Sequence, residues 1–179
     1  KKHAVVAAGA NRYEYDANGA VVNASGTTIT WSSFDLPTRI AHPSGNYSTF
    51  DYGPDRARIR QVARAGGETI ETIYAAGGLY ERVTRGGATS LRHYIVADGR
   101  RVAVHTRVPG SAPTTVYLLE DHLGGVDGFM SSSGALLSRT SNQPFGARRA
   151  GDWVGSTPTS EEWKQVQSTT PRGFTDQEH

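Results

Sequence analysis

The residues best suited to chemistry are Asp121-His122, which three serines follow at positions 131–133. An acid, a histidine and a serine are the groups that nucleophilic catalysis uses when they lie close together. Adjacent residues of a strand point to opposite faces of a sheet, so Asp121 could not orient the His122 ring directly. We therefore expect Asp121-His122-Leu123-Gly124 to form a turn in which His122 bonds to the backbone, and we expect no catalytic residue.

The sequence contains no motif typical of metal binding or phosphate binding. The six histidines are His3, His42, His93, His105, His122 and His179. None forms the His-x-x-x-His or His-Glu-x-x-His spacing typical of metal sites, and cysteine is absent. The glycine-rich pieces lack the Gly-x-x-x-x-Gly-Lys-Ser/Thr pattern that binds phosphate. The sequence predicts neither a metal site nor a cofactor.

Composition narrows the class of protein. The 179 residues are 36% hydrophobic and carry a net charge of +2 at pH 7. The arginines are scattered and interleaved with acids, whereas a nucleic-acid module concentrates its positive charge, so we expect no nucleic-acid partner. No run approaches the roughly 20 apolar residues that a membrane span requires. The 21 glycines and 8 prolines favour many turns over long helices.

A recurring mark divides the chain into short strands. It is an aromatic–acidic pair followed by Gly or Pro, and it stands at Tyr15-Asp16-Ala17-Asn18-Gly19, Phe34-Asp35-Leu36-Pro37 and Phe50-Asp51-Tyr52-Gly53-Pro54. Alternating apolar residues between such marks predict strands, for example at 28–31 and 114–119. Asn18-Gly19 and Asp98-Gly99 predict two-residue hairpin turns of type I′. The pattern as a whole predicts a mainly β fold, an antiparallel sheet of hairpin repeats.

Near the C-terminus the pattern changes to that of a helix. Thr159 precedes Glu162 by three residues, which is the spacing of a capping box. We expect a short helix near residues 160–167 with Trp163 and Val166 on one face. The acids Glu161 and Glu162 are explained by the helix N-terminus, where carboxylates are favoured, rather than by acid–base catalysis.

These marks resemble the YD-repeat, or Rhs-repeat, proteins. The early repeat residues that carry the resemblance are Tyr15, Asp16, Gly19, Phe34, Asp35, Asp51 and Tyr52. A later stretch is similar to the segment that opens the family's Rhs-associated core, and its residues are Tyr117, Asp121, His122, Leu123 and Gly124. Two further core elements correspond to Pro144, Phe145 and Gly146 and to Gly173 and Phe174. The chain departs from the family at Gly125, where Ser is usual.

The resemblance implies a structural role without enzymatic activity. Residues 1–110 would form part of a spiralling β-shell, and residues 111–179 would begin the core and end before its cleavage motif. Such a shell encloses a C-terminal toxin or effector and helps to deliver it. The implied partners are the rest of the parent polypeptide, its cargo, and secretion-system or cell-surface components. The implied location is secreted or on the bacterial cell surface.

A cell-surface or wall-associated β-repeat module that binds glycan or a protein partner is the alternative. Aromatic side chains on a β surface can bind sugars, whereas the shell hypothesis buries the same rings between windings. The position of the rings therefore distinguishes the two hypotheses.

Overall fold

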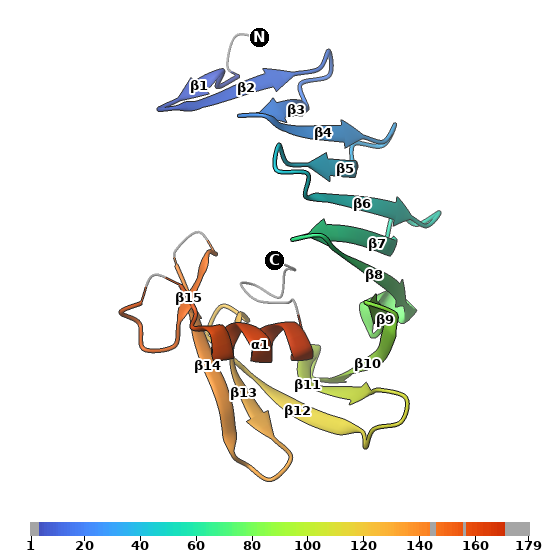
Figure 1. Cartoon of the computed structure of the whole chain (residues 1–179), viewed down its shortest axis with the longest axis vertical. Coiled ribbons are helices and arrows are strands. Elements are labelled where there is room, and N and C mark those ends of the chain that lie inside the picture. The colour runs from blue at the N-terminus through green and yellow to red at the C-terminus, as the bar shows by residue number, and fades with distance from the viewer. Residues whose placement is uncertain (1–3, 144–145, 156, 171–179) are drawn as a thin grey trace. The chain divides into compact units, whose positions relative to one another are not determined.

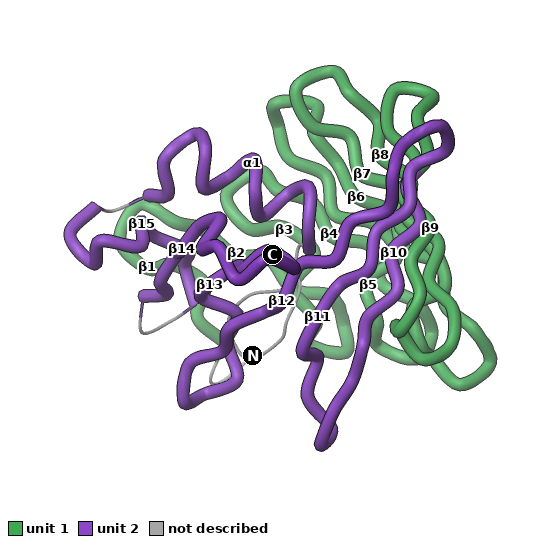
Figure 2. The backbone as a smooth tube through the Cα atoms, turned by 90° about the horizontal axis from the view of Figure 1, so that it is seen from below, with its two compact units in different colours: residues 1–89 green, residues 90–179 purple. Residues whose placement is uncertain are grey.

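The computed structural model describes residues 4–143, 146–155 and 157–170, and within them the chain is mainly β, as predicted (Figure 1). It forms two compact units, residues 1–89 (unit 1) and 90–179 (unit 2), which Figure 2 distinguishes by colour. Within each unit every strand pairs in antiparallel fashion with the next strand in sequence. The domain boundary predicted from the motifs, at residues 110 and 111, stays a prediction.

Unit 1 contains nine short strands and a 3₁₀ turn (Ala76–Gly78) between its last two. The strands are β1 (Ala7–Ala8), β2 (Asn11–Tyr15), β3 (Val21–Ala24), β4 (Thr27–Trp31), β5 (Pro37–Ala41), β6 (Tyr47–Tyr52), β7 (Arg58–Ala65), β8 (Glu68–Ala75) and β9 (Tyr80–Arg85). β10 (Ala88–Ala97) begins here and lies mostly in unit 2. Of the described residues of unit 1, only Glu81 is buried.

Unit 2 continues the strand pattern and adds one helix. Its further elements are β11 (Arg100–Arg107), β12 (Thr114–Glu120), β13 (Val126–Ser131), β14 (Leu136–Asn142), β15 (Arg148–Ala150) and α1 (Ser160–Thr169). Its strands and helix enclose a hydrophobic cluster of Tyr94, Val104, Leu118, Val126, Phe129 and Val166. Figure 1 shows α1 lying against the strands of this unit, and it contacts β14.

The helix begins where the sequence predicts. Thr159 is its N-cap and forms a capping box with Glu162, whose carboxylate accepts the Thr159 backbone N–H at 2.6 Å. The helix extends two residues beyond the predicted end. Val166 is buried at 3% exposure, whereas Trp163, predicted on the same face, is 37% exposed.

Two kinds of turn join the strands. Tight two-residue turns, both residues with positive φ, lie at Ser25-Gly26, Gly66-Gly67, Gly86-Gly87 and Asp98-Gly99. This φ pair is that of the type I′ turn, so the prediction for Asp98-Gly99 is confirmed. The prediction for Asn18-Gly19 is wrong, because only Gly19 has positive φ and the turn spans Asp16 to Ala20.

The second kind, which we call the wide turn, recurs seven times in the described residues. It begins at an anchor residue whose N–H donates to the carbonyl four residues on, and whose carbonyl accepts the N–H three residues on, at 2.8–3.3 Å. The residue three positions after the anchor has positive φ in every case. The anchors are Asp16, Ser32, His42, Gly53, Asp121, Ser131 and Gln143.

Candidate functional site

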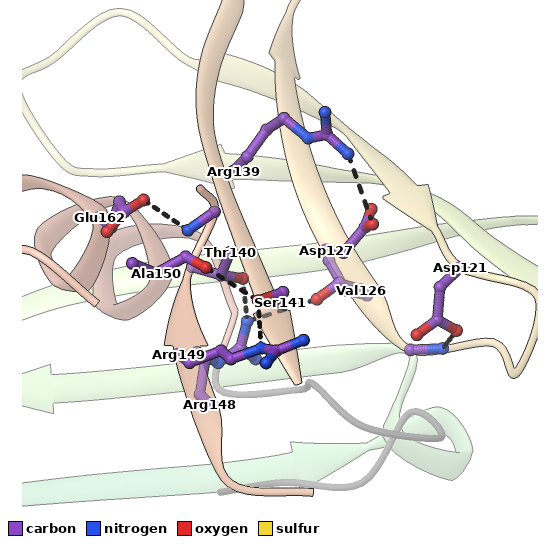
Figure 3. A network of polar contacts seen from close by, with 12 residues as sticks. Asp121, Val126, Asp127, Arg139, Thr140, Ser141, Arg148, Arg149, Ala150 and Glu162 are labelled. Atoms are coloured by element: carbon purple, nitrogen blue, oxygen red, sulfur yellow. Dashed lines mark hydrogen bonds and ion pairs between the residues drawn. The ribbon is translucent and has the colours of Figure 1, made fainter. Parts of the chain in front are cut away.

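The Asp121-His122 turn is a wide turn held by its acid. Oδ1 of Asp121 accepts the N–H groups of Leu123 and Gly125, each at 2.8 Å. Figure 3 shows the Asp121 side chain beside the turn. Gly124 supplies the positive φ of the turn, at +79°. The carboxylate that could have oriented a histidine is therefore committed to the backbone. The bond predicted for His122 is made instead by Asp121.

The predicted acid, histidine and serines do not come together. Ser131 anchors the next wide turn, where its hydroxyl contacts Ser133 at 2.8 Å and accepts the Ala135 N–H at 3.1 Å. The Asp121 and Ser131 turns lie at opposite ends of β13, whose six residues span roughly 17 Å at about 3.3 Å per residue. A nucleophile and its general base must lie within hydrogen-bond distance of each other. The two turns are too far apart for the serines and the Asp121-His122 pair to meet this condition.

Gly125, where the family usually has Ser, lies against the same carboxylate. A Cβ on Gly125 would lie 3.0 Å from Asp121 Oδ2 and 3.3 Å from Asn142 Nδ2. Both contacts are tight, so a side chain here would have to displace the carboxylate or the amide. The glycine at position 125 thus fits the observed position of Asp121.

In unit 1 the structure reveals a repeat that coincides with the sequence mark at Tyr15-Asp16 and differs from it at the other two marks. Three wide-turn anchors follow directly after an aromatic residue: Asp16 after Tyr15, Ser32 after Trp31 and Gly53 after Tyr52. Each of these three aromatic residues sits at a register shift of its strand pair.

Each of the three aromatic residues also donates a side-chain hydrogen bond to a main-chain carbonyl 10 to 15 residues earlier. The acceptors are the carbonyls of Val5, Val21 and Pro37, at 2.7–2.8 Å. We call this arrangement the aromatic tie. A hydroxyl or indole N–H at the edge of an otherwise apolar ring suits a partly buried position that still offers a bond.

The other predicted marks occupy different places in this repeat. Asp16 anchors its turn, with Oδ1 accepting the Gly19 and Ala20 N–H groups. Asp35 instead stands three residues after the anchor, with φ of +61°. Asp51 lies within β6 and pairs with Arg60 at 3.0 Å. The three aspartates that the sequence aligned are therefore not structurally equivalent.

Aromatic rings in unit 1 pack against one another and beneath arginines. Phe34 meets Tyr52 edge-on, with ring centroids 5.9 Å apart. The guanidinium carbons of Arg56 and Arg58 lie 5.6 Å from the Phe34 centroid and 4.9 Å from the Phe50 centroid. Burial raises the pKa of the Tyr52 hydroxyl, and the charge of Arg58 opposes the rise. One face of the Phe34 ring and one face of the Phe50 ring are thus covered by guanidinium groups.

The remaining predicted site residues fall in unit 2 or outside the described residues. Tyr117 lies in β12 at 42% exposure, and Leu123 is 54% exposed in the Asp121 turn. Gly146 has φ of +89° in the wide turn of Gln143. Pro144, Phe145, Gly173 and Phe174 lie outside the described residues.

The predicted capping-box residue Glu162 also joins the beginning of the helix to Gly151, a contact that the sequence did not indicate. One carboxylate oxygen of Glu162, which Figure 3 shows, accepts the Gly151 N–H at 3.0 Å, and the other accepts the Thr159 N–H at 2.6 Å. Gly151 is required there, because a Cβ would come within 2.6 Å of the Arg139 carbonyl oxygen. Burial raises the pKa of Glu162, but these N–H groups and the Thr159 hydroxyl outweigh it and leave the pKa below its ordinary value.

Two strand residues hold the other end of the helix. Arg92 Nη2 donates to the Gln167 carbonyl at 2.7 Å, which satisfies a carbonyl that the helix itself leaves open. The Tyr94 hydroxyl contacts the Thr170 hydroxyl at 2.8 Å. The helix is therefore tied to β10 across about 75 residues of sequence.

A buried arginine connects the last strands. Arg148 is 7% exposed and donates to the Thr140 hydroxyl at 2.8 Å and the Val126 carbonyl at 3.3 Å (Figure 3). Burial lowers the pKa of its guanidinium. Nearby, Arg139 lies 3.9 Å from Asp127, whose pKa is raised by burial and lowered in part by that arginine. These contacts position strands, since they bind backbone and neighbouring side chains.

The described residues contain no group of three or more side chains that could hold a metal ion. Within the same residues, no helix has the length and apolar character to cross a membrane.

Comparison with known proteins identifies the fold. No family model matches the chain, and no curated protein matches its sequence. The crystal structure of TcdB2-TccC3-Cdc42 matches 92% of the chain with a TM-score of 0.71 at 13% identity. The crystal structure of TcdB2-TccC3 matches 92% of the chain with a TM-score of 0.71 at 14% identity. The structure of the Tc holotoxin pore of Photorhabdus luminescens, with a TccC3 mutation, matches 92% with a TM-score of 0.68 at 15% identity.

This chain spans 8% of the length of each of those three chains. At these identities the likeness shows that the chain has the fold of a segment of the toxin complexes.

Proposed function

We propose that the chain is a wall segment of a YD-repeat, or Rhs, shell that encloses a C-terminal toxin or effector and helps to deliver it. The observation that carries the proposal is the aromatic tie at each of three wide turns in unit 1. It supports the proposal because the repeated unit links a strand pair to the chain just before it. The fold shared with the toxin complexes supports the same assignment.

A wall needs an element that can be added many times. In unit 1 each strand pairs with its neighbours in sequence, and the ties reach back only 10 to 15 residues. Architectures of this kind gain stability from each repeat and from its contact with the next. A sheet built in this way can be lengthened without changing the repeats already present.

Unit 2 supplies the kind of closed structure expected where a core begins. Its cluster is covered by α1, and both ends of the helix are tied to strands. We infer that this unit forms part of the Rhs-type core and that it carries no catalytic residue. The commitment of Asp121 and Ser131 to separate turns supports that inference.

The parent polypeptide and its cargo are the proposed partners, and export to the cell surface or medium is the proposed destination. The structures that share the fold contain toxin components, which is consistent with such a setting. A glycan-binding module is less well supported, since arginines lie over the Phe34, Tyr47 and Phe50 rings of unit 1.

The test is protease protection in the natural gene product that contains this chain. We expect a much longer polypeptide whose segment after residue 179 resists protease while the protein is folded and is digested after unfolding. The matched comparison is the same product carrying Phe129→Ala, which should expose the segment at a lower denaturant concentration. A natural product limited to this chain, or a segment digested equally in both states, would refute the shell assignment.

A further inference from the structure

Two histidines that are distant in sequence face each other across a strand pair of unit 2. His93 of β10 is the direct cross-strand partner of His105 in β11. Directly opposite residues of an antiparallel pair have Cβ atoms about 4.5–5.5 Å apart on the same face. His93 is exposed and His105 is half-buried, so the pair lies at the surface. Sequence spacing could not reveal it, because twelve positions separate the residues.

A bulge creates this pairing. Next to the tight turn, Val96 is opposite Arg101, but Ile95 is opposite Ala103, so β11 contains one extra residue. Without that shift, His93 would lie opposite Val104, and His105 would lie opposite Arg92. Since neighbouring residues of a strand point to opposite faces, the two imidazoles would then be on different sides of the sheet.

A third strand orients one of the rings. Thr115 of β12 is the cross-strand partner of His105, and its hydroxyl lies 3.0 Å from His105 Nδ1. When Nδ1 carries the proton and donates to this hydroxyl, Nε2 keeps its lone pair. Histidines that bind metals commonly have the second ring nitrogen held in this way by an outer partner.

We propose that His93 and His105 form a surface site for Zn²⁺, with Thr115 as a positioning residue. Zinc binds imidazole nitrogen at about 2.0–2.1 Å and prefers four ligands, of which the two imidazoles would supply two. Mg²⁺ prefers oxygen ligands and is expected to bind here far more weakly. The proposal is independent of the shell assignment, since it rests on the register of β10, β11 and β12.

The experiment titrates Zn²⁺ into the 179-residue chain and follows the imidazole resonances by NMR, with calorimetry for affinity and Mg²⁺ as the control ion. We expect saturable binding of Zn²⁺ that shifts the resonances of His93 and His105 and leaves those of His122 unchanged. His93→Gln and His105→Gln should each abolish saturable binding, and Thr115→Val should weaken it by about tenfold.

The matched control is His122→Gln, which removes an exposed histidine from a turn of the same unit and should leave Zn²⁺ affinity unchanged. Circular dichroism of each variant establishes that the strands remain. The proposal is overturned if the wild-type chain shows no saturable binding, or if the double variant lacking both His93 and His105 binds Zn²⁺ as the wild type does. Equal affinity in Thr115→Val would remove the positioning role of Thr115.

Discussion

In the described part of unit 1, no hydrophobic side chain is buried, whereas unit 2 encloses a cluster around Phe129 at 0% exposure. Both units are antiparallel sheets with the same wide turns, so the backbone alone does not explain the difference. Unit 1 relies on hydrogen bonds, half-buried aromatic residues and arginines over rings, each acting over a short stretch of chain. Unit 2 adds a helix and contacts between distant segments.

The comparison indicates that strand pairs joined by the same wide turns can form either a sheet held by local contacts or a sheet that closes over a helix. In unit 1, where the contacts are local, the loss of one side chain should destabilise only the neighbouring strands. Where the sheet closes over a helix, the loss of one side chain should weaken the whole cluster. Hydrogen exchange measured separately in each unit can test this distinction, because it reports local opening free energies.

The largest expected effect follows from Phe129→Ala. Removing a fully buried phenylalanine leaves a cavity, and such changes cost about 3–5 kcal/mol. The variant should lose exchange protection throughout unit 2. Phe50→Ala is the matched change in unit 1, where the ring is half-buried, and should cost about 1–2 kcal/mol. Equal losses in the two units would contradict the comparison.

The attachment of the helix gives the next effect. Glu162→Ala removes the acceptor for both the Thr159 and Gly151 N–H groups and should cost about 1–2 kcal/mol. Because the pKa of Glu162 is lowered in the folded state, its contribution is present above the ordinary Glu pKa of 4.5 and is lost as the pH falls through the folded pKa.

Denaturant unfolding of unit 2 should therefore differ between wild type and Glu162→Ala at neutral pH and converge in acid. A difference that persisted at low pH would mean that the charge of the carboxylate is not what holds the cap.

The aromatic tie predicts a smaller and local effect in unit 1. Tyr52→Phe keeps the ring against Phe34 but removes the hydroxyl that donates to the Pro37 carbonyl, at a cost of about 1 kcal/mol. Exchange should increase at β5 and β6 and remain unchanged in unit 2. Tyr117→Phe removes the hydroxyl of an exposed tyrosine of unit 2 and should have no measurable effect.

The last effects, of about 1 kcal/mol or less, concern the residue with positive φ in the wide turns. In unit 1 this position is Asp35 in one turn, whereas unit 2 has glycine there in each described wide turn. Asp35→Gly should stabilise unit 1 by about 0.5 kcal/mol, since glycine adopts positive φ without strain but costs more chain entropy. Gly134→Ala should destabilise its turn by about 1 kcal/mol. Thermal unfolding of both variants would measure the two signs.

Local features were predictable from sequence because their causes lie within a few residues. The capping box of Thr159 and the tight turn at Asp98-Gly99 are set by neighbouring backbone dihedrals and side chains. The mainly β fold follows from the same alternation and turn signals. The wide turn was harder to recognise, since residues as different as Asp, Ser, His, Gly and Gln serve as anchors of one backbone geometry.

Other features depend on register or on distant contacts and could not be read from local pattern. The sequence aligned Phe34-Asp35 with Tyr15-Asp16, but the equivalent pair is Trp31-Ser32, because the tie requires the aromatic residue directly before the anchor. The contact of Arg92 with the helix spans 75 residues. The facing of His93 and His105 depends on a bulge that no turn motif announces.

The reach of these contacts along the chain also sets the order in which the polypeptide can fold during its synthesis. The Tyr52 tie is complete once residue 52 has left the ribosome, since its acceptor was made 15 residues earlier. The contacts of Arg92 and Tyr94 must wait for residues 167 and 170. We expect unit 1 to gain structure strand by strand while unit 2 is still being translated, which force measurements on stalled chains of increasing length would detect. If the chain is the shell wall that we propose, this order would place the wall before its contents are synthesised.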